Sequence, residues 1–288
     1  MRLLVPDRLV ASCRTSVERS LWLDRLPSLV RDLERRWSLL LDAPFDGSDG
    51  SCAWVAPAKR LDGGFAVLKL GMPHIEGEHE IAGLRFWDGD PTVWLLEEDE
   101  EVGAMLLERC EPGLALRELP EPEQDVVIAG LLRRIWREPQ SPSPFRPLED
   151  MMAFWRYQTL NDVERWSDPG LVRHGLELLR ELSRSAPAAM LLATDLHAGN
   201  VLRAAREPWL VIDPKPFVGD PAYDATQHLL NCIERLRTDP ERTIGHFADL
   251  LGVDAQRVRL WLFARAAAEP RDSWEGDEWT ALARTLAP

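Results

Sequence analysis

Lysine is scarce in this chain of 288 residues. Its only lysines are Lys59, Lys69 and Lys215, and the other 31 of its 34 basic residues are arginines. Lys69 lies between Leu68 and Leu70 in an apolar segment with strand character. A chain that avoids lysine but keeps one there indicates that the position needs a compact ammonium group. An exposed lysine at the end of a strand is the alternative.

Cysteines are few, and long apolar runs are missing. The four cysteines are far apart, with no Cys-X-X-Cys pair and no Cys/His cluster at metal-binding spacing. The sequence therefore predicts neither a disulfide framework nor a zinc site. Arg, Asp or Pro interrupts every apolar stretch before the roughly 20 residues of a membrane span, and the N-terminal MRLLVPDRLV has no apolar signal-peptide core. We expect a cytoplasmic protein without a membrane partner.

Basic charge is outweighed by acidic charge, which gives a formal net charge of -14. Binding to a phosphate backbone requires a basic surface, so the sequence predicts no nucleic-acid partner. An acidic protein attracts cationic ligands, although solubility alone also accounts for such a charge. The composition, with 45% hydrophobic and 28% charged residues, is that of a globular protein with a sizeable core. The oligomeric state stays open.

The first third of the chain combines helix and strand patterns. Apolar spacing predicts a helix over residues 17–38, bent or divided at Pro27. Asp62-Gly63 is typical of a hairpin turn, here between strands predicted over 52–57 and 65–70. A short helix is expected over 74–87. A second pair of strands, over 92–96 and 104–108, is joined by the acidic residues 97–101.

After Gly113 helical patterns dominate. We predict helices over residues 124–137, 149–166, 171–184, 221–237, 240–251 and 254–268, with a loop rich in Pro and Ser over 137–147. One small β region interrupts them, over 190–193, 201–204 and 209–213. The sequence thus predicts an α+β protein with a small antiparallel-sheet N-lobe, residues 1–109, and a mainly helical C-lobe, residues 110–288.

The segment Asp195-Leu-His-Ala-Gly-Asn200 and the aliphatic strand ending at Asp213 suit phosphoryl transfer. That reaction needs a carboxylate to orient the attacking hydroxyl and oxygen ligands for Mg²⁺. Asp195 can act as the base, and Asn200 can bind the ion without adding negative charge. Asp213 can present a carboxylate to the same ion. A simple turn, in which Asp195 and Asn200 only satisfy backbone groups, is the alternative.

The chain resembles the aminoglycoside phosphotransferase family, which has a protein-kinase-like fold, and in particular its streptomycin 6-phosphotransferase and hydroxyurea phosphotransferase branch. The resemblance extends over almost the whole chain. Beside DLHAGN and IDPK, it includes WLDRLPSLV, AVLKL, HEIAGLRFWDGD, MLLERCEPG and FVGDPAYD. Each segment is weakly diagnostic alone, whereas their order and spacing together are specific.

The resemblance implies an ATP-dependent enzyme with Mg²⁺ as cofactor. Asp195 matches the catalytic base, and Asn200 and Asp213 match the Mg²⁺ ligands. Lys69 matches the lysine that holds the α- and β-phosphates, and Glu80 matches its ion-pair partner. By the same comparison the N-lobe binds the nucleotide, and the C-lobe carries the catalytic loop and the acceptor site. The choice between ATP and GTP stays open.

Further residues are assigned from the resemblance, from local chemistry or from their position in the chain. Glu108 and Cys110 match positions where backbone groups bond the adenine, and Ser48 belongs to the Gly47–Ser51 loop that folds over the phosphates. His197 is interpreted as a brace of the catalytic loop. Asp220 and Asp224 are expected to cap a helix or brace loops. Asp162, Glu269 and Asp272 are candidates for binding the acceptor.

The sequence departs from the family at one place. Members commonly have His-Gly immediately before the base, where this chain has Ala193-Thr194. Glycine tolerates backbone conformations that threonine resists, so the loop is expected to be set differently. The favoured function is phosphorylation of a cationic aminoglycoside such as streptomycin, hence antibiotic inactivation. The alternatives are another acceptor, such as hydroxyurea, a sugar or an alcohol, and a nucleotide-binding pseudokinase.

Overall fold

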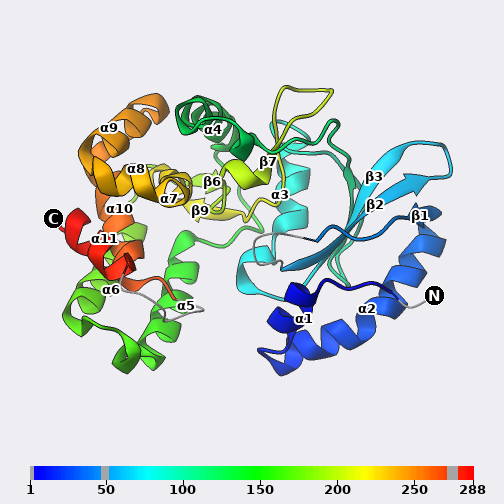
Figure 1. Ribbon diagram of the computed structural model, residues 1–288, viewed down its shortest axis with the longest axis horizontal. Helices are drawn as coiled ribbons and strands as arrows, with labels where there is room; N and C mark the ends of the chain where they lie inside the picture. The colour runs from blue at the N-terminus through cyan, green and yellow to red at the C-terminus, as the bar shows by residue number, and fades with distance from the viewer. Residues whose placement is uncertain (1–2, 47–51, 271–277) are drawn as a thin grey trace. The chain divides into compact units, whose positions relative to one another are not determined.

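The structure is a computed structural model that describes residues 3–46, 52–270 and 278–288 (Figure 1). The chain forms two compact units. Unit 1 consists of Met1–Leu114 together with Leu202–Ile212, and unit 2 of Ala115–Val201 together with Asp213–Pro288. The segment 202–212 thus packs with the N-terminal unit, although its sequence lies within the helical part of the chain. Among the described residues, no helix has the length and apolarity needed to cross a lipid bilayer.

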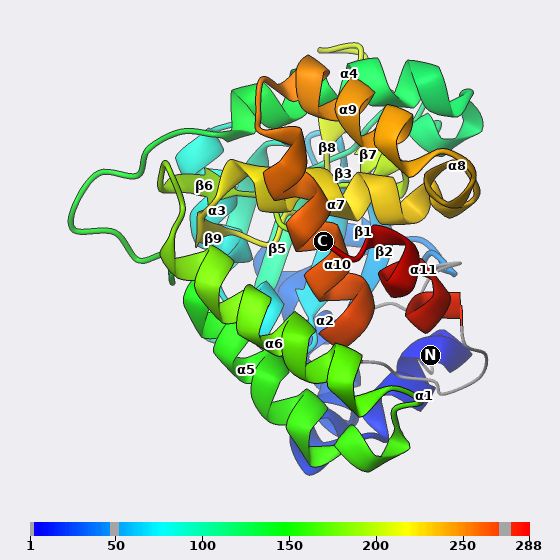
Figure 2. The ribbon, with the colours of Figure 1, turned by 90° about the vertical axis from the view of Figure 1, so that its left-hand side faces the viewer.

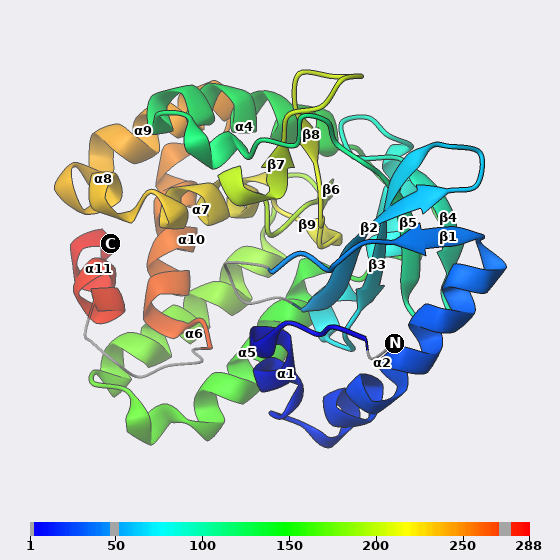
Figure 3. The same ribbon diagram turned by 45° about the vertical axis from the view of Figure 1, so that its right-hand side comes forward.

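Unit 1 is built on a five-stranded antiparallel sheet with the order β1-β2-β3-β5-β4 (Figure 3). The strands are β1 (Leu39–Leu41), β2 (Ala53–Arg60), β3 (Phe65–Gly71), β4 (Leu95–Asp99) and β5 (Ala104–Glu108). The expected hairpin joins β2 to β3. Its Gly63 has φ +88°, and Asp62 accepts a hydrogen bond of 2.9 Å from the Gly64 N–H. Glycine adopts this φ without steric cost, so the local sequence sets the turn.

The strand β4 lies further along the chain than the sequence predicts. It includes Glu97, Glu98 and Asp99, which were expected to form the turn, and it pairs with β5 as far as Asp99 opposite Ala104. The residues assigned to its start have another partner: Val93 N–H donates a 3.0 Å hydrogen bond to the carbonyl of Val211. A pairing across this sequence distance is not visible in local periodicity.

Two N-terminal helices provide much of the core of unit 1. Helix α1 spans Asp7–Cys13 and α2 spans Val17–Arg36, without a break at Pro27. Buried α2 residues such as Leu26 and Val30 belong to one apolar cluster with Trp54 and Leu68 of the sheet. A further helix, α3 (Glu80–Trp87), follows a short 3₁₀ turn at Ile75–Gly77. Its Ile81 and Leu84 pack with Met105 and Leu107 of β5.

Unit 2 is mainly helical (Figure 2). Helices α5 and α6 lie side by side, and α10 packs on α6, α7, α9 and α11. Its helices are α4 (Glu121–Ile135), α5 (Leu148–Asn161), α6 (Pro169–Arg184), α7 (Pro221–Asn231), α8 (Ile233–Thr238), α9 (Pro240–Leu251), α10 (Ala255–Ala268) and α11 (Glu278–Leu286). The single helix predicted over 221–237 is divided at Cys232, where φ is -105° and ψ is 43°. The spacing of apolar residues does not reveal an interruption of one residue, so the sequence predicts one continuous helix.

The predicted β region resolves into two separate pairs of short strands. The strand β6 (Met190–Leu192) pairs with β9 (Phe217–Gly219), a strand that the sequence interpretation did not include. The strands β7 (Val201–Leu202) and β8 (Leu210–Val211) form the other pair. These short strands position the loops that follow β6 and β8.

Candidate active site

The loop between β6 and the 3₁₀ turn at Ala198–Asn200 carries Asp195. The Asn200 side-chain N–H donates a 3.0 Å hydrogen bond to the backbone carbonyl of Asp195. Because this bond uses the amide nitrogen of Asn200, the amide oxygen is the atom that can bind a cation. The side chain of His197 accepts a 3.1 Å hydrogen bond from the Gly199 N–H, so His197 braces the loop as expected.

Thr194 adopts the backbone conformation that a glycine would provide. Its φ is +49°, in the left-handed region. Two hydrogen bonds hold it there: its N–H donates to Asp224 at 2.8 Å, and its hydroxyl donates to the Lys215 carbonyl at 2.6 Å. The left-handed conformation costs about 1–2 kcal/mol for a residue with a side chain, and each hydrogen bond contributes about 1 kcal/mol. The departure from His-Gly is therefore compensated within the loop.

Asp224, on α7, is the anchor of this loop. Its buried carboxylate accepts hydrogen bonds from the backbone N–H groups of Ala193 at 3.0 Å and Thr194 at 2.8 Å, and from the indole of Trp136 at 2.9 Å. Burial raises the pKa of Asp224 to about 6, and the three donated hydrogen bonds act in the opposite direction. Asp220 instead caps α7, accepting from the Ala222 N–H at 3.0 Å.

Asp213 follows β8, and its side chain is about one-third exposed. Its φ of +53° lies in the left-handed region, which aspartate tolerates better than most residues with a side chain. Its carboxylate forms an ion pair with Lys215. A carboxylate oxygen from Asp213 and an amide oxygen from Asn200 are hard ligands, so the donor set fits Mg²⁺.

A side chain that the sequence interpretation did not single out contacts Asp195 directly. Gln227, on α7, donates a 2.7 Å hydrogen bond from its amide nitrogen to Oδ1 of Asp195. The amide oxygen of Gln227 accepts a 2.7 Å hydrogen bond from Arg265 on α10. The sequence does contain an indication that Arg265 has a special role, because Arg265 is the one charged residue within the apolar run Trp261–Ala268.

Arg265 is buried, with 5% of its surface exposed. Its guanidinium makes a bidentate ion pair with Glu269, at 2.7 and 3.1 Å. Burial acts to lower the pKa of Arg265, but Glu269, Tyr223 and Asp195 together outweigh burial and hold the pKa above its usual value. Glu269, a candidate for acceptor binding, is thereby linked through Arg265 and Gln227 to Asp195.

In unit 1, Lys69 of β3 and Glu80 of α3 form a buried ion pair of 2.5 Å. The pairing expected from the resemblance is thus present. The pairing of strands does not bring Lys69 and Glu80 together, because Glu80 belongs to helix α3, which follows β3 in the chain. The short contact with Glu80 fixes the direction of the ammonium group.

Glu108 and Cys110 lie at the end of β5 and just after it, also in unit 1. The Glu108 side chain is engaged by Arg206, with two contacts of 3.1 and 2.9 Å, and by the Trp94 N–H at 3.0 Å. Burial, reinforced by the charge of Glu108, raises the pKa of the Cys110 thiol to about 12. The Glu108 side chain is thus occupied within the protein, and Cys110 packs against the apolar cluster that contains Ile81 and Leu84.

The remaining candidates fall into two groups. Asp162 lies at the end of α5 and forms a 3.4 Å ion pair with Arg165. The ends of α5 and α10 are joined by a 2.8 Å hydrogen bond from the Thr159 hydroxyl to the Ala268 carbonyl, which lies next to Glu269. Ser48, its loop 47–51 and Asp272 lie outside the described residues.

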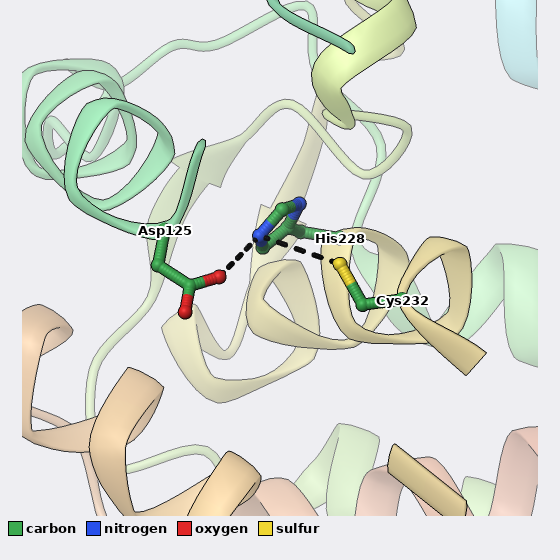
Figure 4. Close-up of side chains that lie close together, drawn as sticks. All are labelled: Asp125, His228 and Cys232. Carbon is green, nitrogen blue, oxygen red and sulfur yellow. Dashed lines mark hydrogen bonds and ion pairs between the residues drawn. The ribbon is translucent and has the colours of Figure 1, made fainter. Parts of the chain in front are cut away.

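A separate cluster of metal-binding residue types, Asp125, His228 and Cys232, is buried in unit 2 (Figure 4). His228 donates to Asp125 at 2.8 Å, and Arg235 already engages both oxygens of Asp125, at 2.7 and 2.8 Å. Burial raises the pKa of the Cys232 thiol to about 12, which disfavours the thiolate that a metal requires. This cluster is therefore a structural ion-pair network between α4, α7 and α8.

The structure is similar to solved kinases. Choline kinase LicA from Streptococcus pneumoniae matches with a TM-score of 0.65 and 13% identity, over 91% of this chain and 97% of that one. Such low identity shows the fold alone. The prediction of an α+β protein with a protein-kinase-like fold is thereby confirmed.

The family is shown by sequence. The profile of the aminoglycoside/hydroxyurea antibiotic resistance kinases matches residues 36–273. A streptomycin 6-kinase of Streptomyces glaucescens is 35% identical over 273 residues, covering 91% of this chain and 88% of that protein. A hydroxyurea phosphotransferase of Kitasatospora aureofaciens is 36% identical over 254 residues, covering 85% and 72%. The chain belongs to the aminoglycoside/hydroxyurea antibiotic resistance kinase family, and it is a kinase that uses ATP with Mg²⁺.

Proposed function

We propose that this kinase transfers the γ-phosphate of ATP to a hydroxyl of an aminoglycoside of the streptomycin type and thereby inactivates the antibiotic in the cytoplasm, where ATP is available. The observation that carries the proposal is the fixed carboxylate of Asp195. Gln227 holds one of its oxygens, and Asn200 holds its backbone carbonyl. A base for phosphoryl transfer must be positioned in this way, because positioning supplies most of the catalysis.

In the proposed reaction, Asp195 accepts the proton of the acceptor hydroxyl. The hydroxyl oxygen forms a bond to the γ-phosphorus as the bond from that phosphorus to the bridging oxygen of the β-phosphate breaks. ADP leaves with the electron pair of that bond. Asp195 then releases its proton to water, which restores the carboxylate.

Asn200 and Asp213 would hold the Mg²⁺. When bound, the ion neutralises the developing negative charge on the phosphate oxygens. Asn200 contributes its amide oxygen, because its nitrogen is already bonded to the Asp195 carbonyl. Lys215, paired with Asp213, balances the carboxylate charge before the nucleotide binds.

The nucleotide is assigned to residues of unit 1. Lys69 would contact the α- and β-phosphates with its ammonium group, and Glu80 would hold that group in position. Backbone groups of Glu108 and Cys110 would bond the adenine, and the loop around Ser48 would cover the phosphates. The burial of both Lys69 and Glu80 supports this assignment, because a lysine at an ordinary surface position would have its ammonium group in solvent.

The acceptor is assigned to acidic residues of unit 2. Asp162 and Glu269 lie at the ends of α5 and α10, which are joined by the Thr159–Ala268 hydrogen bond. Asp272 follows Glu269 closely in the chain. Carboxylates bind guanidinium groups through paired, charge-assisted hydrogen bonds, and streptomycin carries such groups. The net charge of -14 favours the approach of a cationic molecule.

An ADP-release assay with Mg²⁺, ATP and a panel of aminoglycosides tests the proposal. We expect turnover with streptomycin, and we expect Asp195→Ala to lose it while still binding ATP. Hydroxyurea is the second candidate acceptor, because a hydroxyurea phosphotransferase is 36% identical to this chain and a streptomycin 6-kinase is 35% identical to it. Turnover with hydroxyurea and with no aminoglycoside would replace the first assignment, and ATP binding without turnover of any hydroxyl compound would indicate a pseudokinase.

A further inference from the structure

Helix α7 contacts the catalytic loop through two side chains that lie three residues apart. Asp224 binds the backbone N–H groups of Ala193 and Thr194, and Gln227 binds the carboxylate of Asp195. Residues three apart on a helix point to the same side. The same helix face therefore fixes first the backbone of the loop and then the direction of the carboxylate at its tip.

The orientation of the Gln227 amide is determined by its second partner. Arg265 donates to the amide oxygen of Gln227 at 2.7 Å, and a guanidinium has only donors. If the amide were turned over, its NH₂ group would face the NH₂ of Arg265, and its oxygen would face a carboxylate oxygen. Both contacts would be repulsive, so Arg265 ensures that Gln227 presents a donor to Asp195.

Arg265 is itself held rigidly. Its other described partners are the Glu269 carboxylate, the Thr226 hydroxyl at 2.6 Å, and the rings of Trp155 and Tyr223, at 5.7 and 5.2 Å from the guanidinium carbon. A buried arginine with this set of partners keeps a single orientation. It transmits that orientation to the Gln227 amide.

We propose that Gln227 is the positioning residue of Asp195, and that Arg265, paired with Glu269, sets the direction of the Gln227 amide. The hydrogen bond fixes rotation of the Asp195 carboxylate about its Cβ–Cγ bond, so that the carboxylate meets the acceptor hydroxyl in one orientation. This inference rests on the proposed role of Asp195 as the base. It adds two residues, from α7 and α10, that the catalytic motif does not contain.

Four proteins test the inference: the wild type, Gln227→Met, Asp195→Ala and the double variant. The first two are assayed for ADP release with streptomycin, and all four are compared by urea unfolding. Methionine matches glutamine in length but donates no hydrogen bond. We expect Gln227→Met to lower kcat about 10- to 100-fold with an unchanged KM for ATP. Because Asp195→Ala abolishes turnover, that background is compared by urea unfolding, where Gln227→Met should lower the midpoint less than it does beside Asp195, since both substitutions remove the same interaction. An unchanged kcat in Gln227→Met, or equal unfolding shifts in the two backgrounds, would overturn the inference.

Two more variants sharpen the result. Gln227→Glu keeps the size of the side chain but replaces the donor by a carboxylate, so it should lower kcat more than Gln227→Met; retention of the wild-type kcat would contradict the inference. Asn231→Ala is the matched control. Asn231 is an exposed amide one turn later on α7 that donates to the Gln227 carbonyl at 2.9 Å, and its removal should leave kcat unchanged.

A failure of the acceptor assignment is distinguishable from a failure of this inference. If the wild type releases no ADP with streptomycin, the proposed acceptor is wrong, and the urea unfolding of the same four proteins decides the inference without a substrate. Gln227→Met should then lower the unfolding midpoint in the Asp195 background and change it less in the Asp195→Ala background. Equal shifts in both backgrounds would overturn the inference whatever the substrate.

Discussion

The hydroxyl of Thr194 donates a 2.6 Å hydrogen bond to the backbone carbonyl of Lys215. This bond joins the Asp195 loop to the segment that follows Asp213, and both residues are buried. Thr194→Val removes the hydroxyl, keeps the shape and leaves a buried carbonyl without its donor. We expect a loss of about 1–3 kcal/mol in the free energy of unfolding, measured with urea. Thr194→Ser, which keeps the hydroxyl, is the control; equal stability of the two variants would contradict this role.

The Asp224 carboxylate is expected to matter for stability and activity together. Asp224→Ala leaves two backbone N–H groups and the Trp136 indole without their acceptor, at about 1–3 kcal/mol for each buried group. We expect a loss of at least about 3 kcal/mol in urea unfolding and a lower kcat, because the Asp195 loop loses its anchor. Trp136→Phe removes one of the three bonds and should cost about one-third as much. A change in Asp224→Ala below about 0.5 kcal/mol, typical of surface substitutions, would exclude the anchor.

The two lysines on neighbouring strands provide a matched pair for the nucleotide assignment. Lys69 is buried against Glu80, whereas Lys59, on β2, is exposed. We expect Lys69→Met to raise the KM for ATP at least about tenfold, because one charge-assisted contact to a phosphate contributes about 1.5–3 kcal/mol. Lys59→Met should leave the KM unchanged. Equal values for the two variants would remove Lys69 from the nucleotide site.

The Asp125 network predicts a dependence of stability on pH. Burial acts to raise the pKa of Asp125, but hydrogen bonds from His228 and Arg235 outweigh it and lower the pKa from 3.8 to about 2. A lowered pKa in the folded state means stability that is present above pH 3.8 and lost as pH falls towards 2. The shift corresponds to about 2 kcal/mol. We expect the wild type to lose about this amount more than Asp125→Asn between pH 4 and pH 2 in urea unfolding, and parallel curves would contradict the network.

Local sequence was sufficient for the regular elements that carry their own signals. The helix from Val17, the β2–β3 hairpin, and the helices α9 and α10 begin and end close to their predicted positions. In each case the signal is short-range: apolar spacing along one helix face, Asp-Gly at the turn, or Asp before the first helical residue. The strands around Thr92 and Phe217 were misplaced or missed, because their partners are distant in sequence and a short strand has no periodicity of its own.

The sequence by itself determined the chemistry of the loop. Asp195, Asn200 and Asp213 are residue types suited to a base and a hard cation, and they lie close together in the chain or at a strand end. Family membership follows from the same motifs. None of this depends on how distant segments pack, since the motifs are continuous in the sequence.

Only the tertiary structure decided what holds that loop in place. Gln227 is 32 residues from Asp195, and Arg265 is 38 residues further along. Their alignment depends on α7 and α10 packing together, as the accommodation of Thr194 depends on Asp224 and the Lys215 carbonyl. A hydrogen bond between distant residues needs both groups within about 3 Å at a suitable angle, and only the packed helices and strands establish that distance.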